Sequence, residues 1–357
     1  MSYVRPNIDA MSGYVWGEQP EDARTIKLNT NENPYPPSPQ VDAALQSLSG
    51  TSLRRYPQPT ALPLRQALAA QHQLTPDHFV MTNGGDEALR LALTTFVEPG
   101  AGFGMAEPSY SLYEVLAGIH DAQVFKVPLE ESWLPPPDFA SRLNDAGVQL
   151  TCVVNPHAPS GTLQSASELS ELAAALDGVL LIDEAYVDFV DPKRGYNALP
   201  LLAHHDNVLI LRTFSKGYGL AGLRLGYLIG PPALLNPVMW KTRDSYNIDH
   251  LSQVLGEAAF TDQPYAAETW ARVREERARL SAALSERNIR THESQANFLL
   301  ADFSDAGCDA GAVLEGLKSR HVLVRHFDTD RLRGYLRISI GTPEENAQLL
   351  TALDELL

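Results

Sequence analysis

One lysine of the chain lies where its amine could act as a nucleophile. The chain contains only six lysines among its 357 residues, and the other five stand in polar or turn-like segments. Lys216 instead follows the β-like run NVLILRTF and precedes the mostly apolar run GYGLAGLRLGY. A lysine led toward a protein interior is either paired with an acid or used for its amine chemistry. The local sequence leaves both interpretations of Lys216 open.

Three further segments carry reactive or anion-binding groups directly after apolar runs. Asp183 ends the run GVLLID, with Tyr186 three residues later, and a buried carboxylate needs a cationic or hydrogen-bonding partner. Tyr110 offers an aromatic ring after GFGMA, although a single tyrosine is more often part of the core. Gly85 and Asp86 follow HFVMT and open a helix, where free N–H groups favour a phosphate. The alternative there is a tight turn with Asp86 as the helix cap.

Taken together, these groups suit a phosphorylated pyridine aldehyde. A lysine can hold such a ligand covalently, and a carboxylate can keep its ring nitrogen protonated so that the ring acts as an electron sink. The glycine-rich turn and Arg224, eight residues after Lys216, would bind the phosphate. Each signal is weak alone, but their joint order along the chain indicates this chemistry.

The elements that must position these residues alternate between strands and helices. Apolar runs predict strands at 78–82, 102–106, 122–127, 148–155, 178–183 and 207–214, and periodic segments predict helices at 62–74, 86–97, 110–120 and 165–176. Short continuous apolar strands are typical of a mostly parallel α/β sheet that helices cover on both faces. Ligands bind beyond the carboxyl ends of such strands. The candidate residues all follow strands, so we expect them to meet at one edge of the sheet.

The length of the chain predicts more than one domain. Residues 1–40 are rich in Asn and Pro and read as an extended arm rather than a packed element. We expect a large ligand-binding domain at 41–262 and a small α+β domain at 263–357, which takes up part of the arm. A long charged helix near 266–287 should open the small domain, followed by strands at 296–303, 321–327 and 335–341 and helices at 310–319 and 343–356.

Charge and composition exclude several classes of function. A formal net charge of −16 argues against a nucleic-acid groove and an anionic membrane surface. No apolar run approaches the roughly 20 residues that span a bilayer, and the first residues have no signal-peptide core. Cys152 and Cys308 form no disulfide framework, and the adjacent His204 and His205 do not suit one metal ion. We therefore expect a cytoplasmic protein without a metal site.

Nine segments carry a more specific signal as a set. They are LNTNENPY (28–35), RRYPQP (54–59), TNGGDEAL (82–89), EPSYSLY (107–113), NPHAPSG (155–161), LLIDEAYVDF (180–189), RTFSKGYGLAGLRLGY (212–227), SQANFLL (294–300) and LRISIGT (336–342). This set resembles the fold-type I pyridoxal-phosphate aminotransferases, and among them the histidinol-phosphate aminotransferases. The resemblance covers nearly the whole chain. It implies a pyridoxal 5'-phosphate cofactor, a mostly parallel sheet covered by helices, and a smaller α+β domain.

The resemblance also implies roles for individual residues around the cofactor ring. Lys216 would hold the cofactor covalently and then act as the base of a 1,3-proton shift. Asp183 would pair with the ring nitrogen, Tyr186 would bond the phenolic oxygen, and Tyr110 would stack on the ring. The residues that would hold the cofactor phosphate are Gly85, Asp86, Thr213 or Ser215, and Arg224.

Four more residues are carried over to the substrate and to a partner subunit. Tyr56 resembles a tyrosine that reaches the cofactor phosphate of the neighbouring subunit, which implies a homodimer with shared active sites. Arg337 matches an arginine that meets the acidic group of the substrate, and Arg325 is similar to a second arginine that favours a substrate phosphate. Asn33 is assigned to the substrate site as well.

One segment departs from the family pattern. Where the family usually has Asn-Pro-Thr-Gly, this chain has Ala158-Pro159-Ser160-Gly161. The missing asparagine would have bonded the phenolic oxygen of the cofactor. His157 beside it is a candidate replacement, and a turn residue that points to solvent is the alternative.

The resemblance favours transfer of the amino group of L-histidinol phosphate to 2-oxoglutarate, a reaction of histidine biosynthesis. Alternatives within the same fold are an aromatic amino-acid aminotransferase and a threonine-phosphate decarboxylase. A non-catalytic cofactor-binding module is disfavoured because the nucleophile is intact. A nucleotide-binding oxidoreductase would need a GxGxxG turn, which TNGGDEAL does not supply.

Overall fold

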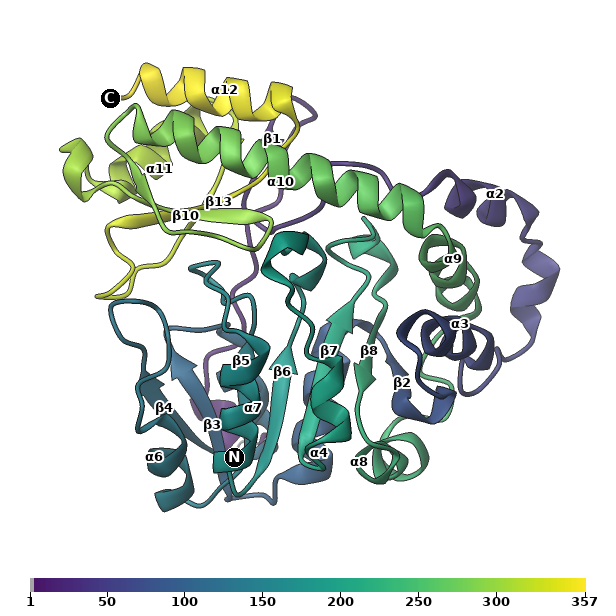
Figure 1. Ribbon diagram of the computed structural model, residues 1–357. Coiled ribbons are helices and arrows are strands. Elements are labelled where there is room, and N and C mark those ends of the chain that lie inside the picture. Colours follow the sequence, from purple (N-terminus) through teal and green to yellow (C-terminus); the bar gives the residue numbers. More distant parts are fainter. Residues whose placement is uncertain (1–2) are drawn as a thin grey trace.

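The structure is a computed structural model that describes residues 3–357, and its larger part is built on a seven-stranded sheet (Figure 1). The strand order is β2-β8-β7-β6-β5-β3-β4, and β8 alone runs antiparallel to its neighbours within this sheet. The strands are β2 (Phe79–Thr82), β3 (Gly102–Glu107), β4 (Gln123–Pro128), β5 (Val148–Val154), β6 (Val179–Asp183), β7 (Val208–Thr213) and β8 (Gly226–Ile229). The prediction of a mostly parallel α/β sheet is confirmed.

Helices cover both faces of this sheet, which explains why its strands are apolar on both sides. Along β7, Leu209 and Leu211 pack into one hydrophobic cluster, whereas Val208 and Ile210 pack into another. The first cluster includes α4 (Gly84–Phe96) and α5 (Leu112–His120); the second includes α3 (Leu62–His72), α6 (Phe139–Asp145), α7 (Ala166–Ala175) and α9 (His250–Thr261). Further helices are α2 (Pro39–Ser47) and α8 (Pro232–Pro237).

The C-terminal part folds around a second, antiparallel sheet with the order β12-β13-β10-β9. It lies beyond the large sheet in Figure 1, with the long helix α10 running along it. Its elements are α10 (Gln263–Ser285), β9 (Arg290–Thr291), β10 (Phe298–Asp302), α11 (Ala310–Ser319), β11 (Val322–Leu323), β12 (Arg325–His326), β13 (Tyr335–Ser339) and α12 (Pro343–Asp354). The junction of α9 and α10 is where we divide the two domains, and this division stays a prediction.

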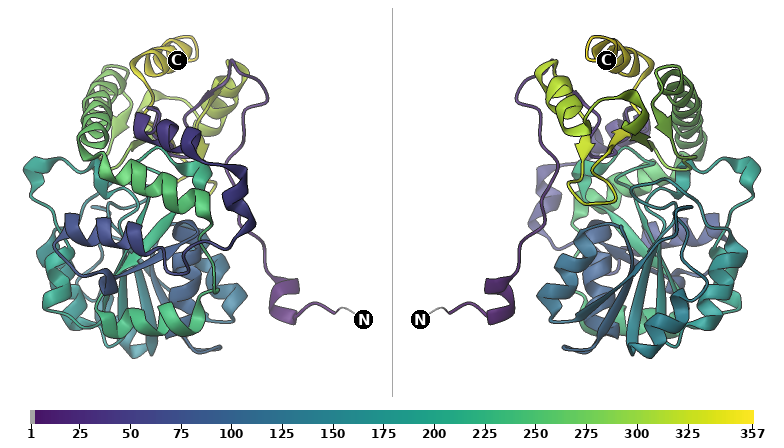
Figure 2. Two further views of the ribbon diagram at one scale, coloured as in Figure 1. Left: turned by 90° about the vertical axis from the view of Figure 1, so that its right-hand side faces the viewer. Right: turned by 90° about the vertical axis from the view of Figure 1, so that its left-hand side faces the viewer.

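The N-terminal segment is more than an extended arm. It includes α1 (Pro6–Ala10), which projects from the side of the molecule in Figure 2. Asn7 Nδ2 donates a hydrogen bond to the Gly118 carbonyl of α5 at 3.0 Å, so α1 is attached to the larger part. Farther on, β1 (Ile26–Lys27) pairs in parallel with β11. The residues after β1 then pass between the two sheets, where Leu28, Asn29 and Asn31 are buried. Residues 26–31 of this segment therefore pack against elements of the C-terminal part, while the division into domains stays a prediction.

Two other local differences have plain causes. The expected strand at 321–327 is broken into β11 and β12, which pair with different partners. Strand β8 lies in the glycine-rich run after Lys216, for which the sequence predicted no strand.

Among residues 3–357, no helix has both the length and the apolar composition to cross a bilayer. Within the same range, no cluster of three His, Cys, Asp or Glu side chains could hold a metal ion.

Candidate active site

A cavity of about 200 Å³ lies at the carboxyl edge of the large sheet and is closed by the small sheet and the N-terminal segment. The turns after β2, β3, β6 and β7 all contribute to it, as parallel strands require. The sequence-predicted residues that line the cavity are Gly85, Asp86, Tyr110, Asp183, Tyr186, Thr213, Ser215, Lys216, Arg224, Arg325 and Arg337.

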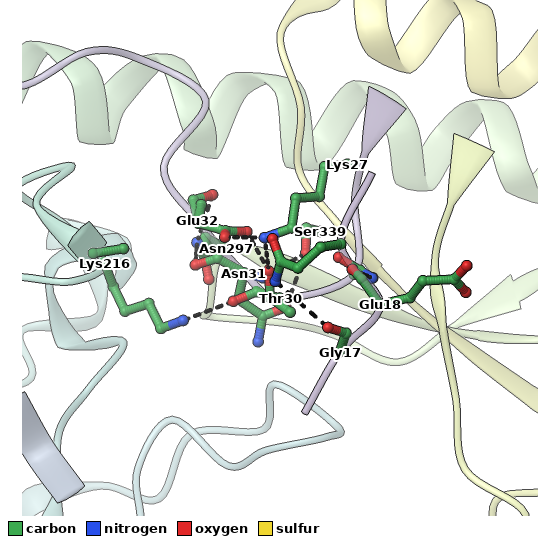
Figure 3. Close-up of polar contacts among 12 residues, drawn as sticks. Gly17, Glu18, Lys27, Thr30, Asn31, Glu32, Lys216, Asn297 and Ser339 are labelled. Atoms are coloured by element: carbon green, nitrogen blue, oxygen red, sulfur yellow. Dashed lines mark hydrogen bonds and ion pairs between the residues drawn. The ribbon is translucent and has the colours of Figure 1, made fainter. Parts of the chain in front are cut away.

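Lys216 lies in the turn after β7 and directs its amine toward the N-terminal segment. Its Nζ donates a hydrogen bond to the backbone carbonyl of Thr30 at 2.8 Å (Figure 3). Burial lowers the pKa of Lys216 to about 8, and the charges of Arg337 and Arg224 act in the same direction, against Glu32. A much larger fraction of this amine is therefore neutral near pH 8 than for an ordinary lysine, which favours the chemical interpretation over that of a simple ion pair.

Asp183 ends β6 with its carboxylate inside the protein. Oδ2 accepts a hydrogen bond from the Tyr113 hydroxyl at 2.7 Å, and Oδ1 accepts from the Ala185 backbone N–H at 3.1 Å. Burial nevertheless raises the pKa of Asp183 to about 6, because two neutral donors only partly offset the loss of water. A cation placed beside this carboxylate would restore its ordinary pKa.

Two aromatic side chains frame the same region of the cavity. Tyr110 packs edge-to-face on Tyr113, with ring centroids 5.5 Å apart, and on Tyr14 at 5.9 Å. The hydroxyl of Tyr186 accepts a hydrogen bond from Asn31 Nδ2 at 3.0 Å, and burial raises the pKa of this tyrosine. Both phenols therefore stay neutral and can act as hydrogen-bond donors.

An anion-binding corner forms where α4 begins. Gly84 has a φ of +74°, and a Cβ at this position would lie 2.7 Å from Arg224 Nη2, so glycine permits the guanidinium to approach the helix start. Arg224 Nη1 donates to Ser215 Oγ at 3.1 Å, while Nη2 lies 3.5 Å from an Asp86 oxygen. Asp86 lies in the first turn of α4 and is not its N-cap, which is Asn83. The helix N-terminus and the arginine together suit a phosphate.

Two arginines of the small sheet supply a second set of cationic groups. Arg325 and Arg337 are paired neighbours on β12 and β13. Arg337 Nη2 donates to the Asn29 carbonyl at 3.1 Å, but its Nε is buried and has no hydrogen-bond partner among residues 3–357. Arg325 donates to the backbone carbonyls of Val15 at 3.1 Å and Trp16 at 3.4 Å. A buried N–H of a guanidinium without an acceptor is costly, so this end of the cavity also fits an anionic group.

Comparison with known protein families identifies the family of this chain. The family model described as aminotransferase class I and II matches residues 23–353. The chain belongs to this family.

Known relatives of this aminotransferase cover its full length. It is 40% identical over 358 residues to histidinol-phosphate aminotransferase 1 of Nostoc sp., covering all of this chain and 98% of the relative. It is 41% identical over 360 residues to a histidinol-phosphate aminotransferase of Geobacter sp., covering 100% and 99% of the two chains. The crystal structure of histidinol-phosphate aminotransferase from Sinorhizobium meliloti in complex with pyridoxal-5'-phosphate superposes with a TM-score of 0.90 at 24% identity, covering 100% and 98%. That likeness confirms the fold.

Three predicted residues lie outside the cavity lining of the aminotransferase. His157 is buried, and its ring nitrogens contact Ser160 Oγ at 2.7 Å and the Pro108 carbonyl at 3.0 Å. Because both nitrogens are engaged, the interpretation of His157 as a cofactor contact disagrees with the structure. Asn33 was assigned to the substrate, yet its Nδ2 donates to the Gly217 carbonyl at 2.9 Å, so it tethers the Lys216 turn instead.

Tyr56 is also remote from the cavity of its own chain. Its side chain is 80% exposed and stacks on Tyr246, with ring centroids 4.5 Å apart. An exposed tyrosine that does not reach the site of its own chain could contribute only to the site of another subunit. That role of Tyr56 across a subunit interface stays a prediction.

Sequence reasoning missed several residues that the fold brings to the cavity. Tyr14 and Asn31 come from the N-terminal segment, and Phe327 follows β12. Tyr113 bonds Asp183 from within α5. Tyr113 lies only three residues after Tyr110, within the segment EPSYSLY that carries part of the family resemblance. The residues of the N-terminal segment carry no comparable periodic signal.

Proposed function

We propose that this aminotransferase uses pyridoxal 5'-phosphate to transfer the amino group of L-histidinol phosphate to 2-oxoglutarate, which yields imidazole-acetol phosphate and L-glutamate. The names of its full-length relatives support this amino donor. The pyridoxal phosphate in the Sinorhizobium meliloti relative supports the cofactor. An aromatic amino-acid aminotransferase or a threonine-phosphate decarboxylase is not favoured by these relatives.

The side chains of the cavity fit this cofactor. Asp183 is a carboxylate whose pKa is raised by burial, and a protonated ring nitrogen beside it would supply a compensating positive charge. Lys216 offers an amine with a lowered pKa. The start of α4 with Arg224 and Ser215 forms a phosphate-binding corner, and Tyr110 offers a ring face. We propose that these residues hold the cofactor, without a contribution from His157.

The chain's own residues then have separate tasks. When bound, the cofactor supplies an electron sink for negative charge that develops on the substrate carbon. Lys216 takes and returns the proton at that carbon, and the Thr30 carbonyl is the acceptor that holds its amine. Asp183 would stay ionised and hold the ring nitrogen protonated, and Tyr186 would donate a hydrogen bond to the phenolic oxygen.

The observation that carries the substrate proposal is the pair of arginines on the small sheet. Histidinol phosphate brings a phosphate and no carboxylate, whereas 2-oxoglutarate brings two carboxylates, so one site must accept both kinds of anion in turn. A planar guanidinium pairs with either group. The unpartnered Nε of Arg337 points to such a ligand, with Arg325 as its neighbour. We propose that Arg337 serves both substrates and that Arg325 chiefly serves the phosphate.

Three further features belong to the same proposal. We propose a cytoplasmic homodimer whose active sites each take Tyr56 from the partner subunit. The small-molecule partners are the amino donor and 2-oxoglutarate. The large domain at 41–262 and the small domain at 263–357 would enclose the substrate between them.

Steady-state and single-half-reaction kinetics with a panel of amino donors test this function. The donors are histidinol phosphate, phenylalanine, tyrosine and threonine phosphate, each with 2-oxoglutarate as the acceptor. We expect histidinol phosphate to have the highest kcat/KM. Arg325→Ala should lower kcat/KM for histidinol phosphate by roughly 10–100-fold, which corresponds to the free energy of one hydrogen bond to a charged group. The same variant should lower kcat/KM for phenylalanine much less. Arg337→Ala should impair both half-reactions.

Arg320→Ala is the matched control, because Arg320 is bonded to Glu355 at the surface of the small domain, outside the cavity lining. Loss of the contacts between Arg325 and the N-terminal segment would affect every donor equally. Equal losses for histidinol phosphate and phenylalanine in Arg325→Ala would therefore mean that Arg325 does not bind the phosphate. A preference of the wild-type enzyme for phenylalanine would favour the aromatic aminotransferase instead.

A further inference from the structure

Asn31 and Ser339 form a buried pair beside the cavity, far apart in sequence and adjacent in the fold (Figure 3). We propose that they are positioning residues that keep the hydroxyl proton of Tyr186 free for donation into the cavity. The identity of the acceptor in the cavity, the phenolic oxygen of pyridoxal phosphate, rests on the function proposed above. The pair itself is described by the contacts that follow.

The two residues are joined by two hydrogen bonds. The Asn31 backbone N–H donates to Ser339 Oγ at 2.9 Å, and Ser339 Oγ donates to Asn31 Oδ1 at 3.0 Å. The other end of the amide, Asn31 Nδ2, donates to the Tyr186 hydroxyl at 3.0 Å. Asn31 and Ser339 are almost completely buried, so water does not compete for these groups.

Ser339 fixes which end of the amide faces Tyr186. An asparagine amide can be turned over so that its oxygen and nitrogen exchange places. Ser339 Oγ already accepts the Asn31 backbone N–H, and its own proton needs an acceptor, which only Oδ1 of the amide supplies among its contacts in the described residues. The amide oxygen therefore faces Ser339, and the NH₂ group faces Tyr186.

This orientation decides where the proton of Tyr186 goes. The Tyr186 oxygen accepts from Asn31, and among residues 3–357 its own proton has no acceptor. Because Tyr186 lines the cavity, that proton can be donated to a ligand there. In the inverted orientation, the amide oxygen would face the phenol and take the proton for itself. Ala158 also lines the cavity and has no polar side chain that could donate a hydrogen bond there. A ligand in this part of the cavity therefore depends more on the hydroxyl proton of Tyr186.

The backbone around Asn31 holds the amide in place. Asn31 has a φ of +58°, a left-handed conformation that asparagine tolerates better than most residues. Its carbonyl accepts from the buried Asn297 Nδ2 at 2.9 Å, and the Ser339 backbone N–H donates to the Leu28 carbonyl at 2.9 Å. The N-terminal segment is thereby fastened to β13 through Ser339 and to Asn297, which directly precedes β10.

Other charged and titratable groups also act on Tyr186, and the test must separate them from the pair. They are Arg337, Asp183, Tyr14 and Lys216. A double-mutant cycle with Tyr186→Phe does so, because it removes the phenol proton and leaves the other groups in place.

The experiment follows the visible absorbance of the protein loaded with pyridoxal phosphate as a function of pH. Donation from Tyr186 stabilises negative charge on the phenolic oxygen and so lowers the apparent pKa of the absorbance change. Asn31→Asp replaces the donor with an isosteric acceptor and should raise this pKa by about one to two pH units, the effect of losing one hydrogen bond to a charged group. Ser339→Ala adds no charge and should raise it by a smaller amount. Ser339→Thr, which keeps the hydroxyl, should stay near the wild type.

In the Tyr186→Phe background, the shift from Ser339→Ala should vanish, and that from Asn31→Asp should fall to the part caused by its added charge. Shifts of undiminished size in that background, or wild-type behaviour of both single variants, would overturn the proposal. If one variant does not fold, the other decides. A wild-type protein that binds no pyridoxal phosphate would instead overturn the proposed function, so the two failures are distinguishable.

Discussion

The amine of Lys216 is the residue-scale feature on which the chemistry depends. It is half-buried, its Nζ donates a hydrogen bond to a backbone carbonyl, and two arginines lie near enough to disfavour its charge. Glu32 opposes them, since its carboxylate favours the ammonium form and is itself paired with Lys27. The balance of these groups sets the pH above which the amine is neutral.

We expect the rate at which the cofactor-free protein captures pyridoxal phosphate to rise with pH and to level off above about 8. The neutral amine is the nucleophile, and its fraction falls about tenfold for each pH unit below the pKa. Glu32→Gln should move the midpoint to lower pH, because it removes the negative charge and leaves Lys27 unpaired. Stopped-flow absorbance measures the capture rate and its pH midpoint in both proteins, and borohydride trapping tests whether the adduct is on Lys216.

Glu171→Gln, an exposed change on α7, is the matched control and should leave the midpoint unchanged. A midpoint near the ordinary lysine value of about 10.4, or a borohydride adduct on another lysine, would contradict the assignment of Lys216.

At the scale of elements, the turn that carries Lys216 is held from three sides. The Gly217 carbonyl accepts from Asn33 Nδ2 at 2.9 Å and from Trp270 Nε1 at 2.7 Å. Beneath it, Asp188 lies in a short 3₁₀ turn, Val187–Phe189, and its carboxylate abuts Gly217. This packing has no room for a side chain at position 217.

Gly217→Ala should therefore displace the Lys216 turn. A Cβ there would lie 2.6 Å from Asp188 Cγ and 2.7 Å from Asp188 Cβ, so the body of the aspartate is in the way as well as its end. We expect a loss of about 1–3 kcal/mol in the free energy of unfolding, typical of overpacking, together with slower capture of pyridoxal phosphate. Thermal unfolding and the capture assay above measure the two effects.

Gly222→Ala is the matched control, since a Cβ at Gly222 would meet nothing within 4 Å. The double variant Gly217→Ala/Asp188→Ala should recover part of both losses because it removes the clashing carboxylate. If Gly217→Ala behaves like Gly222→Ala, the turn is not held as tightly as the contacts indicate.

At the scale of the whole molecule, one face carries exposed aromatic side chains that a monomer does not need. Tyr56 and Tyr246 stack on each other while remaining exposed. Such surfaces mark protein interfaces, and an isologous dimer would bring the Tyr56 of each subunit to its partner.

If each active site takes Tyr56 from the partner subunit, two defective chains should complement each other. We expect Tyr56→Ala and Lys216→Ala homodimers to be strongly impaired. After co-refolding in equal amounts, half of the dimers are mixed, and each has one intact site, so about a quarter of all sites should be active. Activity after mixing, read beside the mass from light scattering, measures this. Tyr3→Ala mixed with Lys216→Ala controls for recovery from refolding alone; an active monomer, or no complementation, would contradict the shared site.

Much of this arrangement follows from patterns in the sequence. Continuous apolar runs such as VLILRT occur where helices cover both faces of a sheet, and parallel strands bring their carboxyl ends to one edge. Asp183, Lys216 and Gly85 were therefore expected to meet, and they line one cavity. Their local signals suffice because each residue lies directly at the end of a strand, where the sheet sets its position.

Two features of the site were decided by tertiary structure alone, the direction of the His157 ring and the contribution of the N-terminal segment. His157 lies next to the departure at Ala158 and was the natural candidate from sequence, yet its turn directs both ring nitrogens to Ser160 and Pro108. Asn31 reaches Tyr186 across 155 positions of sequence. The physical reason is that a segment without helix or strand periodicity carries no signal for the direction of its side chains. Their direction is fixed only when distant partners, here Ser339 and Asn297, satisfy their buried polar groups.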